Sequence, residues 1–96
     1  MGQDAIIRRK NREPLGARVQ VIDRLSSAFP NAKFVSEPIG QWSGAFEANG
    51  LAIEFHFGAE GVIQEVHICM NGDLNKIFDH VAPLGDWLID TGLSQI

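Results

Sequence analysis

Apolar residues recur at intervals of three and four positions in the first third of the chain. After Pro14, this spacing holds through Leu15, Val19, Ile22, Leu25 and Phe29. Such a periodicity places one apolar stripe along a helix. Pro14 suits a first helical turn because its missing N–H has no helical partner there, and Pro30 followed by Asn31 stops a helix. The pattern predicts a helix over about 15–29.

Alternating apolar and polar residues replace this periodicity farther along the chain. Asn49-Gly50 favours a two-residue hairpin turn, because both of its residues suit the positive φ that such a turn needs. A second tight turn at 58–61 leads into the longest alternating run. The order of runs and turns indicates an antiparallel meander. The predicted strands are 32–36, 43–48, 51–57 and 62–70.

The two turns also predict the register of the strands. The turn at Asn49-Gly50 places Phe46 opposite Ile53, and the second turn places Ile53 opposite Val66. Because a slip of one residue would move every side chain to the other face, the pattern specifies the register strongly. The core side of the predicted sheet holds Trp42, Phe46, Ile53, Phe55, Val66 and Ile68.

Two further elements follow the meander. Asn71-Gly72-Asp73 ends the sheet and offers a helix N-cap, and a second apolar stripe predicts a helix that ends near Pro83. Residues 87–90 fit a helical turn or a short last strand, and their alternation favours the strand. The stripe consists of Leu74, Ile77, Phe78 and Val81.

These elements together predict the fold class. We expect an α+β fold in the order α-β-β-β-β-α, with two helices packed on one face of a four-stranded antiparallel meander that has room for a short fifth strand. The other face of the sheet would be open to water or to a partner.

The open face of the predicted sheet gathers ionisable side chains. Histidine and carboxylate groups are ligands for zinc or iron, but a flat sheet holds side chains roughly parallel, whereas metal ligands converge on one point. Glu54 opposite Glu65 favours a shifted carboxyl pKa, and Ser43 beside His56 favours an activated hydroxyl; no oxyanion-hole loop accompanies them. The face comprises Ser43, Ala45, Glu47, Ala52, Glu54, His56, Ile63, Glu65, His67 and Cys69.

Partner binding and plain exposure to water are the two simpler interpretations of this face. Small and apolar residues lie at its centre and acidic residues surround them, as in many binding patches. Histidine changes charge near neutral pH, so the affinity for a partner is expected to depend on pH. We expect no catalytic residue, no metal and no cofactor. The candidate partner-binding residues are Glu47, Glu54, His56, Ile63, Glu65 and His67.

Charge is distributed unevenly along the 96 residues. Residues 1–14 hold four basic and two acidic side chains, a balance of +2, and the remainder hold four basic and ten acidic side chains, a balance of −6. We interpret 1–14 as a flexible basic N-terminal segment and 15–96 as a single domain. The basic residues of the segment are Arg8, Arg9, Lys10 and Arg12.

Composition narrows the classes of partner and compartment. An acidic body disfavours nucleic acid, because phosphate contacts need Lys and Arg. No apolar run approaches the roughly 20 residues of a membrane span. The single cysteine excludes an internal disulfide framework, which indicates a reducing compartment, the cytoplasm.

Several short motifs carry a resemblance to a known family. They are Trp42-x-Gly44, Gly50-Leu51-x-Ile53-Glu54-Phe55, Val62-x-x-x-Val66-His67-Ile68, Gly72-Asp73, Trp87 and Asp90-Thr91-Gly92. Over about 15–92 the chain resembles a family of small uncharacterised bacterial α/β proteins, some of which are similar to immunity proteins encoded beside secreted toxins. The chain departs from the family at Cys69, Met70 and Asn71, where an arginine and a run of glycines are expected. The resemblance implies no catalytic residue.

The sequence thus favours a non-enzymatic bacterial protein-binding domain, and the resemblance implies that its protein partner is a toxin. A small homodimer, paired through the sheet face or an edge strand, is the alternative. A metal-dependent enzyme ranks third.

Overall fold

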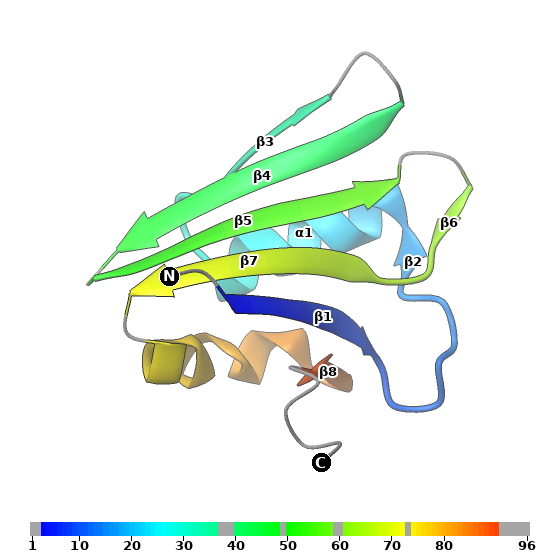
Figure 1. The fold of residues 1–96 in the computed structure, drawn as a ribbon. Coiled ribbons are helices and arrows are strands. Elements are labelled where there is room, and N and C mark those ends of the chain that lie inside the picture. Colours follow the sequence, from blue (N-terminus) through cyan, green and yellow to red (C-terminus); the bar gives the residue numbers. More distant parts are fainter. Residues whose placement is uncertain (1–2, 37–39, 49, 59–60, 73, 91–96) are drawn as a thin grey trace.

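Six of the described strands form one antiparallel sheet. The computed structural model describes residues 3–36, 40–48, 50–58, 61–72 and 74–90. The sheet has the order β3-β4-β5-β7-β1-β8, and β2 and β6 form a separate two-stranded ribbon (Figure 1). The elements, with η for a 3₁₀ helix, are β1 (Gln3–Arg9), β2 (Gly16–Ala17), α1 (Arg18–Ala28), β3 (Lys33–Ser36), β4 (Gln41–Ala48), β5 (Leu51–Gly58), β6 (Val62–Ile63), β7 (Val66–Gly72), η1 (Leu74–His80), η2 (Ala82–Leu84) and β8 (Trp87–Asp90).

The core lies between the helices and one face of the sheet. Phe29, which follows α1, is fully buried, and its ring centroid lies 5.3 Å from that of Phe46 and 5.2 Å from that of Phe55. His80, at the end of η1, stacks on Phe29 at 5.2 Å, and its Nδ1 lies 2.9 Å from the carbonyl oxygen of Ala28. Within the described residues, the helices leave the opposite face of the sheet uncovered, and α1 lies behind β5 and β7 in Figure 1.

The expected four-stranded sheet with two α-helices is wrong. Strands β1 and β8 extend the meander to six strands, and the fold is mainly β. The second predicted helix is the 3₁₀ helix η1, in which residues three positions apart align. Ile77 is therefore buried, whereas Phe78, from the same predicted stripe, is 61% exposed. The short last strand is confirmed as β8, paired with β1.

The largest correction concerns the N-terminal segment. Residues 3–9 are not a flexible basic tail but form β1, an interior strand between β7 and β8. Ala5 and Ile7 are buried in the core. The neighbouring arginines pair with carboxylates: Arg8 Nη2 lies 3.2 Å from Asp90 Oδ2, and Arg9 binds Asp86. These carboxylates are more than 70 residues away in the sequence. The basic residues therefore look unpaired in the sequence, as they would in a solvated terminus.

Helix α1 begins later than predicted and turns a different side inward. Before it, β2 pairs with β6, and the N–H of Leu15 donates to the carbonyl of Ile63 at 2.7 Å. The helix buries Leu25 of the predicted stripe, and Ile22 of that stripe packs against the core in part. The other buried positions of the helix are Val21 and Ala28, so its buried side is rotated from the predicted one. Val19 is consequently 67% exposed.

The register of the first hairpin is confirmed and that of the second is wrong. Phe46 pairs with Ile53 as predicted, but Ile53 pairs with Met70 rather than Val66. The reason is that β6 leaves the sheet to pair with β2, so 62–70 is not one strand. The displacement is four residues, an even number, and each side chain of β7 therefore keeps the face that alternation predicts.

Some expectations fall outside the described residues. These are the turn residue Asn49, the N-cap Asp73 and the Thr91-Gly92 end of the family motif. No helix in the described part of the chain is long and apolar enough to cross a membrane.

Candidate protein-binding face

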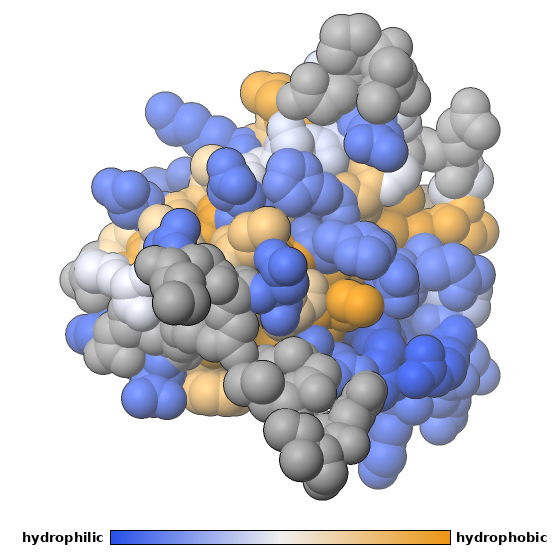
Figure 2. Space-filling view, in the orientation of Figure 1, coloured by the Kyte–Doolittle hydropathy of each residue, from blue (hydrophilic) through white to orange (hydrophobic). Residues whose placement is uncertain are grey.

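The uncovered side of the sheet is built by strict alternation with the core. On β5, Ile53 and Phe55 are buried while Glu54 and His56 are exposed. We call this side the open face. It presents Asp4, Ile6, Arg8, Lys33, Val35, Ser43, Ala45, Glu47, Ala52, Glu54, His56, His67, Cys69, Asn71, Leu88 and Asp90. Figure 2 shows hydrophilic side chains across the molecule in the same view, with smaller apolar areas between them.

Strand pairing arranges the open face in rows that cross the sheet. In one row His56 and His67 lie directly opposite each other on β5 and β7, so that their imidazoles are cross-strand neighbours. We call the next row the carboxylate row, because Glu54 and Asp4 flank Cys69 in it. This row contains Lys33, Ala45, Glu54, Cys69 and Asp4.

Ion pairs occur at the β1 side of the open face. The guanidinium of Arg8 and the carboxylate of Asp90 are each only 18% exposed, so this pair joins β1 to β8 in a partly dry setting. His67 Nε2 also lies 3.2 Å from Oε1 of Glu65, which precedes β7, and this contact is an ion pair only when the imidazole is protonated. Neither pair involves Glu47 or Glu54.

The thiol of Cys69 is held in its neutral form. Its S–H donates to Asp4 Oδ1 at 3.1 Å. This hydrogen bond is the main reason that the pKa of Cys69 is raised, and desolvation and the negative charges of Asp4 and Glu54 raise it further. Because the thiolate is the nucleophile, Cys69 is a weak one at neutral pH.

Negative charge dominates the open face and its border. The Arg8–Asp90 pair is neutral overall, which leaves Lys33 as the remaining basic side chain of the residues above. Against it stand four carboxylates, so the local balance is −3 with neutral histidines. The carboxylates are those of Asp4, Glu47, Glu54 and Glu65.

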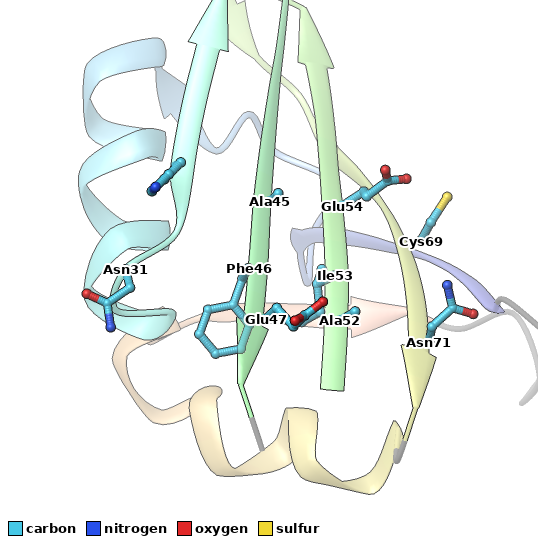
Figure 3. A pocket seen from close by; sticks show the side chains of 10 residues that line it. Asn31, Ala45, Phe46, Glu47, Ala52, Ile53, Glu54, Cys69 and Asn71 are labelled. Atoms are coloured by element: carbon cyan, nitrogen blue, oxygen red, sulfur yellow. The ribbon is translucent and has the colours of Figure 1, made fainter. Parts of the chain in front are cut away.

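A shallow hollow of about 510 Å³ lies at the carboxylate row of the open face (Figure 3). Its side chains combine carboxylates, amides, an ammonium group and small methyl groups. In Figure 3, Glu54, Cys69 and Asn71 project to the same side of the sheet from β5 and β7. The lining comprises Asn31, Lys33, Ala45, Phe46, Glu47, Ala52, Ile53, Glu54, Cys69 and Asn71.

The structure brings most of the predicted site together. Glu47, Glu54, His56 and His67 lie on the open face, and Glu65 lies beside His67. The exception is Ile63, which is 3% exposed because β6 carries it into the core.

Of the two pairings predicted within the site, one is confirmed and one is wrong. Ser43 lies opposite His56 as predicted. The predicted carboxylate pair does not form, since Glu54 lies opposite Cys69 rather than Glu65. Sequence reasoning also missed Asp4, Arg8 and Asp90, although the alternation around Ala5 and Ile7 was a usable signal for β1.

Neither a metal-binding group nor a known relative identifies the site. Among the described residues, no group of three or more His, Cys, Asp or Glu side chains has an arrangement that could hold a metal ion. Comparison of the chain with protein-family models, with curated proteins and with solved structures gives no match.

Proposed function

We propose that this chain is a non-enzymatic protein-binding domain that contacts another protein through the open face. The observation that carries the proposal is the architecture: one face of a six-stranded sheet is covered by helices, and the other presents unpaired carboxylates around small side chains. Antiparallel sheets tolerate one wetted face, but an apolar or small centre with a charged border is typical of binding patches.

The dimensions of the open face suit a protein ligand. Six strands spaced by about 4.8 Å span about 24 Å, and an eight-residue strand such as β5 extends for about 26 Å. The product is about 600 Å² before side chains are counted, against about 800 Å² that each partner contributes to a standard interface.

Two observations favour this function over the alternatives. The raised pKa of Cys69 works against nucleophilic catalysis. A homodimer built face to face would set the carboxylates of one copy against those of the other, since a two-fold interface buries the same patch on both subunits. Such like-charge contact disfavours association.

The resemblance of the sequence to immunity-like bacterial proteins supplies the biological form of the proposal. In that form the domain neutralises a toxin in the cytoplasm by stoichiometric burial of a surface that the toxin needs. A compartment that keeps Cys69 reduced fits its free thiol.

Site-specific photo-crosslinking tests the proposed interface. A photoreactive residue is placed at Ala45 or Ser43 on the open face, and at Val19 or Asp79 on the helical side as controls. In a lysate of cells that produce the protein naturally, the open-face positions should capture one protein that the controls do not. Equal capture from both sets, or capture only from the helical side, would contradict the proposal.

A further inference from the structure

We infer that the partner presents a cationic protein surface, and that one of its arginine or lysine side chains lies over the hollow between Glu47 and Glu54. This inference rests on the proposed function and names the chemistry of the partner. It follows from which charged side chains of the domain pair with one another and which carboxylates remain unpaired.

In the described residues, three of the eight basic side chains pair with carboxylates of the domain. Arg9 and Arg24 share the carboxylate of Asp86, with Arg24 Nη1 lying 3.3 Å from Asp86 Oδ1, and Arg8 is paired with Asp90. Arg24 also lies over a tryptophan ring on the helical side of the sheet, 4.6 Å from its centroid. The positive charges of these three arginines are therefore largely neutralised in place.

The carboxylates of the open face are not neutralised in the same way. In the described residues, Glu47 and Glu54 form no ion pair, and both are exposed. Among the described residues, the side chain of Asp4 accepts one hydrogen bond, from the neutral thiol of Cys69. A surface that keeps unpaired charge of one sign attracts the opposite sign and speeds encounter with it.

The pairing of β4 with β5 gives these charges a defined geometry. Glu47 lies opposite Ala52, and Ala45 lies opposite Glu54, so the two carboxylates occupy one diagonal of a four-residue square and two methyl groups the other. Diagonal neighbours of this kind are about 7–8 Å apart. A guanidinium between them can donate to both carboxylates while its aliphatic stem covers the methyl groups.

The other occupants fit less well. A nucleic acid would bring phosphates against the same carboxylates, and a second copy would bring an identical set of carboxylates. An acidic protein surface meets the same obstacle. Of these occupants, only a cationic protein surface complements the negative charge of the two carboxylates and also covers the methyl groups between them.

A peptide probe tests this inference on the full chain. The probe is a nine-residue capped peptide with arginine at every second position, and its control replaces each arginine by neutral citrulline. Binding is followed by ¹⁵N NMR in low salt. We expect the arginine peptide to shift amides of β4 and β5 around Glu47 and Glu54, and the citrulline peptide to bind at least tenfold more weakly.

Two charge-matched variants separate a local site from bulk attraction. The pair Glu47→Gln with Glu54→Gln removes two charges from the hollow, and the pair Glu13→Gln with Asp79→Asn removes two exposed charges elsewhere. The first should weaken the arginine peptide about tenfold, and the second less than twofold. Equal weakening in both, equal binding of citrulline, or shifts centred on α1 would overturn the inference.

The outcome is distinguishable from that of the proposed function. If crosslinking identifies a partner on the open face whose contacting surface is neutral or acidic, the domain binds protein but the inference about its partner is wrong. If amide shifts on the open face depend on protein concentration without any peptide, a second copy occupies the face and the inference is likewise overturned.

Discussion

Replacing Gly72 by alanine probes a position at which a Cβ would overlap a neighbouring strand end. Gly72 closes β7 opposite Leu51 with a φ of 94°. A Cβ at this position would overlap the carbonyl oxygen of Gly50 and lie 2.9 Å from its carbonyl carbon. The substitution therefore imposes two costs: a side chain at positive φ, and a displacement of the backbone at the end of the β4–β5 hairpin.

The two costs have separate magnitudes. The backbone conformation costs about 1–2 kcal/mol for a residue with a Cβ, and relief of the overlap costs about 1–3 kcal/mol, as for other overpacked positions. The sum, about 2–5 kcal/mol, is a large share of the roughly 5–14 kcal/mol expected for a 96-residue domain. At about 4–8 °C per kcal/mol, the midpoint of thermal unfolding should fall by at least about 8 °C.

Gly50→Ala is the matched control. Gly50 also has positive φ, 82°, but a Cβ there would meet nothing within 4 Å. The Gly50→Ala variant should therefore lose only the backbone contribution, about 1–2 kcal/mol of its free energy of unfolding. Urea denaturation followed by tryptophan fluorescence gives both free energies of unfolding. If the two variants agree within about 0.5 kcal/mol, the steric argument for Gly72 is refuted.

Three further predictions address the rest of the fold. Deletion of residues 1–9 removes the strand between β7 and β8, and circular dichroism should show an unfolded chain; a folded product would restore the flexible-tail interpretation. His80→Ala loses a hydrogen bond to the last turn of α1 and a ring contact, so chemical denaturation should show a loss of about 2 kcal/mol, against less than about 0.5 kcal/mol for exposed His56→Ala. Asp4→Asn removes the main cause of the raised pKa of Cys69, so iodoacetamide should alkylate the thiol faster at pH 8 and its reactivity profile should move to lower pH; an unchanged profile would contradict the assigned cause.

Where a structural signal was local, the sequence predicted it well. The β4–β5 register followed from one turn pair and the alternation on either side, and Glu47, Glu54 and His56 therefore reached the expected face. Alternation also placed His67 on that face, because the displacement along β7 is an even number of residues.

Long-range signals were the ones that sequence reasoning missed. Strand β6 pairs with β2 instead of continuing the sheet, and no short sequence pattern around Ile63 predicts that pairing. The charges of Arg8 and Arg9 concealed an interior strand because their carboxylate partners come near the end of the chain. The helical stripe predicted the correct type of element and the burial of Leu25, but the buried side of the helix is rotated toward Val21 and Ala28.

The interior position of β1 has a consequence for how the sheet folds. This strand precedes both of its partners in the sequence, and Asp4 meets Cys69 across a separation of 65 residues while Arg8 meets Asp90 across 82. Contacts of such separation close slowly, because loop entropy is paid before they form. During synthesis, Ala5 and Ile7 therefore stay without their neighbours in the sheet until β7 and then β8 have also been made.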